Sequence, residues 1–121
     1  MRSILRGFFE AEPDFELCGE AEHGREAIDK AIIFKPHLII LDFQMPVMNG
    51  LEAAPILLTH LPTVIIILHT AYATDALESA ALASGVHAVV PKESAGMHLI
   101  PTARALFKAR QAFGDGRTAT A

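Results

Sequence analysis

Two short apolar runs constrain the fold of this chain more than any other feature. His37–Leu41 and Val64–Leu68 are too short for helices, and polar residues do not alternate with apolar ones within them. Strands of this kind are typical of parallel sheets, in which crossover helices cover both faces. The two runs therefore predict buried strands of an α/β protein.

Helix and strand patterns alternate along the rest of the chain. Apolar residues at helical spacing predict helices over 1–12, 25–34, 51–60, 75–84 and within 95–113, and further strands are predicted over 15–21 and 87–90. Thr74 is expected to cap the helix over 75–84 and Gly85 to end it, whereas Pro101 must lie in the first turn of the last helix or kink it. The alternation predicts a doubly wound parallel sheet, although it opens on a helix where a strand is expected.

The composition fits one globular domain. Of the 121 residues, 51% are hydrophobic and 20% are charged, and 10 Lys and Arg against 14 Asp and Glu give a net charge of −4. This acidic balance argues against direct contact with nucleic acid, which needs a basic surface. The longest strongly apolar run, Val64–Leu68, is too short to span a membrane, and the single Cys18 fits a reducing compartment. We therefore expect a cytoplasmic location and no membrane contact.

Three polar residues lie where predicted strands end. Asp42 closes one apolar run, Thr70 lies just past the other, and Lys92 follows the strand over 87–90. Functional groups of doubly wound sheets gather at the carboxyl ends of the strands, so these side chains are expected to converge. A carboxylate nucleophile beside a hydroxyl and an ammonium suits a covalent phosphoryl site. Taken alone, an Asp at a strand end is more often a cap or turn residue, so the prediction depends on all three.

Residues 41–50, with Asp42 followed by Met45-Pro46 and then Gly50, resemble the phosphoacceptor segment of response-regulator receiver (CheY-like) domains of two-component systems. Residues 15–27, 68–71, and Gly85 with 91–94 resemble further parts of the same family, so the resemblance covers about 1–112. It implies a flavodoxin-like sheet of order 2-1-3-4-5 with strand 1 missing from this chain. We therefore expect an N-terminally incomplete receiver domain over 1–112 and a flexible tail over 113–121.

The resemblance assigns roles to individual residues. Asp42 would accept a phosphoryl group from a histidine kinase or phosphotransfer protein, Thr70 would be the switch hydroxyl, and Lys92 would pair with the phosphoryl oxygens. The side chains of Gln44 and Tyr72 would flank the attacking water and set the lifetime of the phosphoaspartate. Asp42 and the backbone carbonyl of Gln44 would bind Mg²⁺, a cation that prefers oxygen ligands. The chain would then be no enzyme beyond accepting its own phosphoryl group.

Two departures from the family pattern change these expectations. The acidic pair that ends the family's first strand is absent, because the chain begins within what matches the first helix, as a fragment or a degenerate receiver would. Mg²⁺ binding is therefore expected to be weak or absent. Val89 stands in place of an aromatic residue three before the Lys, which leaves Tyr72 or His87 as candidates for reporting the switch.

Other interpretations remain open at this point. A phosphorylation-independent pseudo-receiver, acting as a protein-interaction module, is the main alternative. An aspartate-nucleophile phosphatase is disfavoured because Gln44 stands where its general-acid carboxylate belongs. The face over 75–111, which carries basic residues of the last helix, is expected to bind a downstream protein or a second receiver, or else to be a solvated charged face. Of the histidines, which lack zinc-site spacing, His69 is kept as a possible site residue.

Overall fold

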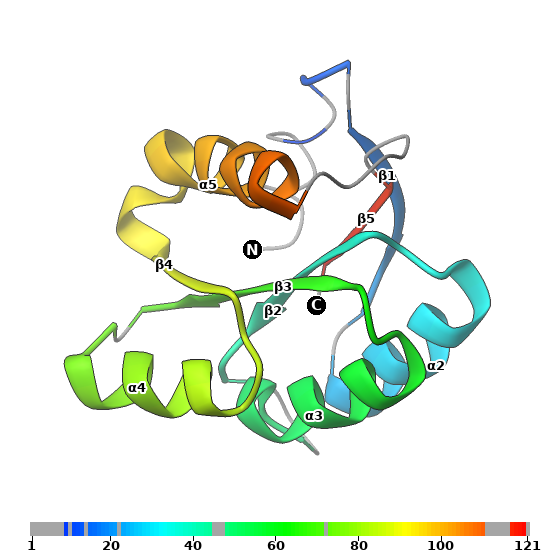
Figure 1. Ribbon diagram of the computed structural model, residues 1–121, viewed down its shortest axis with the longest axis horizontal. Helices are drawn as coiled ribbons and strands as arrows, with labels where there is room; N and C mark the ends of the chain where they lie inside the picture. Colours follow the sequence, from blue (N-terminus) through cyan, green and yellow to red (C-terminus); the bar gives the residue numbers. More distant parts are fainter. Residues whose placement is uncertain are drawn as a thin grey trace.

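The computed structural model describes residues 9, 11–13, 15–21, 23–44, 48–71, 73–110 and 117–120, with 16–20 and 117–120 described by their backbone. The elements in chain order are β1 (Glu16–Glu20), α2 (Gly24–Phe34), β2 (Leu38–Asp42), α3 (Gly50–His60), β3 (Ile65–Thr70), α4 (Asp75–Ala83), β4 (Ala88–Pro91), the 3₁₀ turn η1 (Lys92–Ser94), α5 (Ala95–Arg110) and β5 (Arg117–Thr120) (Figure 1). The predicted alternation of helices and strands is confirmed over these residues. The helix predicted over 1–12 lies outside the described residues, except for Phe9 and 11–12.

Side-chain caps explain where the helices begin. Asn49 and Glu52 form a reciprocal capping box at the start of α3, with the Asn49 side chain accepting from the Glu52 N–H at 2.9 Å. Thr74 accepts from the Leu77 N–H at 3.1 Å, which confirms the predicted cap of α4. Beyond α4, Gly85 has φ +98°, and a Cβ there would lie 2.3 Å from Leu58 Cδ1.

The two apolar runs form the adjacent buried strands β2 and β3, which pair in parallel from Leu38↔Ile65 to Asp42↔His69. Their side chains alternate between two cores. One core, between the sheet and α2, α3 and α4, contains Ile39, Leu41, Ile66 and Leu68. The other core, on the α5 side, contains Leu38, Ile40, Ile65 and Ile67. Figure 1 shows α5 on one side of the sheet and α2, α3 and α4 on the other, so the predicted doubly wound α/β class is confirmed.

The position between β1 and β2 is filled by the C-terminal strand β5. Within the described residues the sheet order is β1-β5-β2-β3-β4, and β5 is parallel to both neighbours, with Leu38↔Thr118 and Ile40↔Thr120 on the β2 side. In the order 2-1-3-4-5 this is the place of the missing strand 1. The prediction of a flexible tail over 113–121 is therefore wrong for 117–120, whereas 113–116 and 121 lie outside the described residues.

Backbone pairing and crossover geometry together explain the position of β5. A gap of one strand between β1 and β2 would leave the N–H and C=O groups on their facing edges unpaired. An extended segment in this gap pairs with both edges. Helices α2, α3 and α4 carry the chain along the sheet in one direction on one face, and α5 carries it back on the other face. Reversing direction and face together is what right-handed crossovers require.

The expectation that Pro101 lies in the first turn of the last helix is wrong. Pro101 is an interior residue of α5 rather than a first-turn residue, because the helix already begins at Ala95 after η1. Its ring removes the donor that would otherwise bond the carbonyl of Met97, on a turn that is exposed to solvent.

Blocking one backbone donor of β5 should destabilise the whole sheet. We expect Thr118→Pro to lower the free energy of unfolding by about 1–3 kcal/mol, because a central strand uses its N–H groups and Pro has none. In a thermal melt this is a fall of roughly 5–10 °C in the midpoint. Thr118→Val keeps the N–H and the β-branched shape, so it should melt within about 2 °C of the unmodified chain. Equal midpoints for the two variants would contradict the central position of β5.

Candidate functional site

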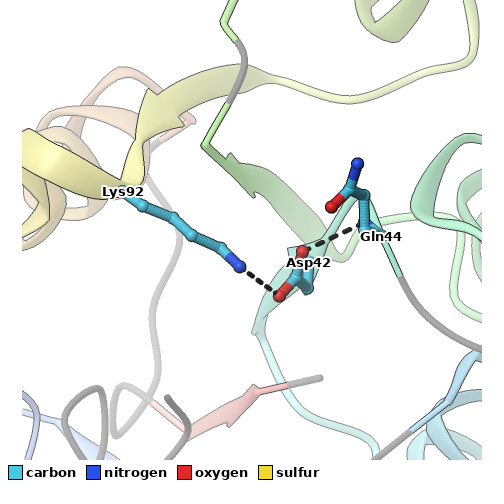
Figure 2. Close-up of polar contacts among 3 residues, drawn as sticks. All are labelled: Asp42, Gln44 and Lys92. Atoms are coloured by element: carbon cyan, nitrogen blue, oxygen red, sulfur yellow. Dashed lines mark hydrogen bonds and ion pairs between the residues drawn. The ribbon is translucent and has the colours of Figure 1, made fainter.

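The carboxyl edge of the sheet brings together the residues that the sequence singled out. Asp42 ends β2, Thr70 ends β3, and Lys92 directly follows β4, so the three come from adjacent strands. The Lys92 ammonium Nζ lies 2.7 Å from Asp42 Oδ2, although the two residues are 50 positions apart in sequence. Figure 2 shows Lys92 reaching the carboxylate from one side while Gln44 lies on the other.

The backbone after Asp42 fixes the orientation of its carboxylate. The Gln44 N–H donates to Asp42 Oδ1 at 3.0 Å, as in an Asx turn, and the Phe43 N–H donates to the His69 carbonyl at 3.2 Å. The glycine of the motif has a packing reason, because a Cβ on Gly50 would lie 2.6 Å from Leu68 Cδ1 and 2.9 Å from the Asp42 carbonyl oxygen. The start of α3 can therefore approach the end of β2 only with glycine at this position.

The ion pair at this edge is neither fully exposed nor fully buried. The side chains of Lys92 and Asp42 are 22% and 20% exposed. One carboxylate oxygen is held by an ammonium and the other by a backbone N–H, so the group is oriented while part of it still faces solvent. An oriented carboxylate with a cation beside it can act as a nucleophile toward an electrophilic, anionic group and can stabilise the charge that the group brings.

The structure describes two of the three remaining predicted site residues. Thr70 is 1% exposed and belongs to β3, so this strand extends two residues past the apolar run Val64–Leu68. The ladder continues past the apolar run because Thr70 is in register with Pro91 of β4. Gln44 is exposed and contributes its N–H to Asp42, whereas Tyr72 lies outside the described residues.

The described residues offer few ligands for Mg²⁺ around Asp42. Over the described ranges no group of three or more His, Cys, Asp or Glu side chains gathers in a metal-binding arrangement. Mg²⁺ demands near-octahedral oxygen ligation, and the Lys92 ammonium already lies against one oxygen of Asp42. On the other side of β2, the described part of β5 ends at Thr120, which is in register with Ile40 and is not acidic.

His69 is the most unusual group near this edge. It is 1% exposed, and neither ring nitrogen has a hydrogen-bond partner among the residues that the structure describes. Burial and, to a smaller extent, the positive charge of Lys92 lower the pKa of this imidazole from 6.5 to about 4, while the negative charge of Asp42 opposes the shift. The imidazole is therefore neutral near pH 7. The sequence signal was its position directly after an apolar run and next to Thr70.

Acid should destabilise the fold through His69. Between pH values of about 6.5 and 4 the unfolded imidazole binds a proton that the folded one does not, so the free energy of unfolding falls as pH drops through this window. The loss attributable to His69 is of the order of 3 kcal/mol by pH 4. Urea unfolding at pH 7 and pH 4 should show a smaller loss in His69→Leu than in the unmodified chain, and equal losses would contradict a buried neutral imidazole.

Comparisons with known proteins agree with this geometry. A family model described as "Response regulator receiver domain" matches residues 1–104. A protein-glutamate methylesterase/protein-glutamine glutaminase of Pyrococcus abyssi is 33% identical over 101 residues, which are 82% of this chain and 27% of that protein. A similarly named protein of Myxococcus xanthus is 38% identical over 92 residues, 75% of this chain and 26% of that protein. The chain thus spans about a quarter of the length of these relatives, and 19% of a Thermotoga maritima relative.

Solved structures point to the same family. The response regulator domain of Thermotoga maritima CheB superposes with a TM-score of 0.74 at 30% identity, over 93% of this chain and 87% of that one. The isolated REC domain of RcsB from Salmonella enterica serovar Typhimurium gives 0.76 at 26% identity, over 90% and 80%. The resemblance seen in the sequence is confirmed, and the chain belongs to the response regulator receiver domains, the phosphorelay modules of two-component systems.

Proposed function

We propose that this chain accepts a phosphoryl group on Asp42 from a histidine kinase or phosphotransfer protein and thereby switches a partner-binding surface. The observation that carries the proposal is the Asp42 carboxylate at the carboxyl edge, oriented by the Gln44 N–H and paired with Lys92 at 2.7 Å. Membership of the receiver family supports the same role. The chain acts as a regulatory module and is not an enzyme beyond its own phosphorylation.

The transfer itself needs a nucleophile and a cation. A carboxylate oxygen of Asp42 attacks the phosphorus of a phosphohistidine, a P–O bond forms as the P–N bond breaks, and the leaving imidazole takes up a proton. The carboxylate loses its negative charge when it becomes an acyl phosphate, and the ammonium of Lys92 remains beside the charged phosphoryl oxygens. Gln44 and Tyr72 then flank the water that hydrolyses the phosphoaspartate, so they set its lifetime.

Receiver domains generally bind Mg²⁺ at their acidic pocket, and this chain departs from that pattern. Asp42 and the backbone carbonyl of Gln44 are the ligands that we assign to the ion, and with so few oxygens its binding is weak or absent. Lys92 is therefore the main positive charge available to the phosphoryl group.

The switch runs from Thr70 to the face over 75–111. The Thr70 hydroxyl, at the buried end of β3, turns to a phosphoryl oxygen and draws the following loop toward Asp42, which changes how α4 lies. Two exposed apolar side chains on this face, Leu82 and Met97, suit contact with a downstream protein or a second receiver. Arg104 already binds Glu12 and lies over the Phe15 ring, so it supports the fold more than the surface.

A phosphorylation-independent pseudo-receiver is the second candidate, favoured by the absence of a metal-binding cluster among the described residues. Neither candidate involves direct contact with nucleic acid or membrane. In the described part of the chain, no helix has the length and apolar character needed to cross a bilayer.

A phosphoryl mimic separates the two candidates. Beryllofluoride, the mimic present with the Salmonella REC domain, should raise the melting midpoint of this chain by several degrees, because a ligand that binds only the folded state stabilises it by about 2.7 kcal/mol at 100 times its Kd. We expect Asp42→Asn to abolish the rise. The melts should be run with and without Mg²⁺, and a rise that needs little Mg²⁺ would support Lys92 as the main cation.

Asp29 offers a matched control for this experiment. Its carboxylate is exposed on α2 and pairs with Arg25 at 3.7 Å, and it has no part in the site at the carboxyl edge. Asp29→Asn should therefore respond to beryllofluoride like the unmodified chain. An unmodified chain whose midpoint does not move would overturn the phosphoacceptor role and leave the pseudo-receiver.

A further inference from the structure

His69 lies on the same face of the sheet as the phosphoacceptor. Side chains of β3 alternate, and Ile65 and Ile67 point into the core on the α5 side, so His69 follows them onto that face. Asp42 follows Ile40 onto the same face in β2, and it is the register partner of His69. Neighbouring residues of adjacent strands on one face lie side by side, so the imidazole stands next to the carboxylate.

The burial of His69 leaves polar atoms without partners. Both Nδ1 and Nε2 are buried and unpaired among the described residues, in a strand whose preceding side chains are all Ile or Leu. An apolar residue would be buried here without the cost of an unsatisfied donor and acceptor. The imidazole therefore offers a hydrogen bond that no described residue of the unphosphorylated chain takes up.

The charges around His69 indicate which partner suits it. His69 is the register partner of Asp42, and the Lys92 ammonium lies 2.7 Å from that carboxylate, so both charges lie close to the ring. A neutral imidazole has one N–H donor and one acceptor nitrogen. A tetrahedral oxyanion on Asp42 would bring several acceptor oxygens to this place, where the described residues offer Lys92 as a charged donor.

We propose that His69 is a binding residue of the phosphoryl pocket, whose ring N–H donates a hydrogen bond to an oxygen of the group carried by Asp42. The inference rests on the proposed phosphoacceptor role of Asp42. His69 would supply part of the stabilisation of the phosphoryl group that a metal ion held by an acidic cluster would otherwise give. The described residues contain no such cluster. A histidine that destabilises the free chain would then form a stabilising hydrogen bond once Asp42 carries the phosphoryl group.

The test compares His69→Leu with the unmodified chain by two measurements on each. We expect the unliganded His69→Leu variant to melt at a higher temperature, because two unsatisfied buried nitrogens are removed, and to bind beryllofluoride about tenfold more weakly, because one hydrogen bond to the ligand is lost. A merely structural histidine would not give this opposite pair of effects. His69→Asn keeps an N–H donor and should recover most of the affinity.

A spectroscopic measurement keeps the proposal testable if His69→Leu folds poorly. The ring ¹⁵N resonances of His69 should shift when beryllofluoride is added to the unmodified chain, and they should stay in place in Asp42→Asn. His98, exposed on α5, provides the control, since His98→Leu should change neither affinity nor the His69 resonances.

The outcomes distinguish this inference from the proposed function. If the unmodified chain binds beryllofluoride through Asp42 and His69→Leu binds it within about twofold, or if the His69 resonances do not shift, the role of His69 is overturned and the phosphoacceptor stands. If the unmodified chain does not bind at all, the phosphoacceptor role fails, and the role of His69 fails with it.

Discussion

The backbone groups along the inner edges of β1 and β2 impose the constraint on which the rest of the molecule depends. Each edge carries N–H and C=O groups that need partners, and β5 pairs with both. Without a strand there, β1 would have no backbone pairing with the central pair β2 and β3. The last element of the described chain thus holds the first one in the sheet, and the carboxyl edge that carries Asp42 keeps its shape because the sheet is continuous.

The elements that were predictable from sequence are those in which local pattern and burial agree. The runs around Ile39 and Ile66 are apolar because both faces are covered, and that is visible in one sequence. The cap at Thr74 and the turn at Gly85 are local as well. In contrast, β5 forms because a gap exists elsewhere in the sheet, and its alternation of Thr and Ala contains no apolar run. A strand of this kind is determined by the strands on either side of it, so its own residues do not predict it.

The candidate site was likewise only partly predictable from the sequence. The pairing of Asp42 with Lys92 followed from the rule that strands of a parallel sheet end at one edge, and the structure gives it a distance. The burial of His69, and the lack of hydrogen-bond partners for its ring nitrogens among the described residues, did not follow from the sequence. Whether a histidine at a strand end faces solvent or core depends on how far the strand pairing extends. Here β3 runs two residues past the apolar run, which carries both His69 and Thr70 into the interior.

The direction of β5 also has a practical consequence for handling this protein. Because β5 runs parallel to β2, with Thr120 beside Ile40, the described part of β5 ends two residues before the level of Asp42. An affinity tag, fluorophore or fusion partner placed directly after β5 would therefore begin near the edge of the sheet that carries Asp42 and Lys92. Labels for interaction measurements are better attached to exposed positions at the C-terminal end of α2, such as Ile33, because this end of the helix leads into the start of β2 and not its carboxyl end.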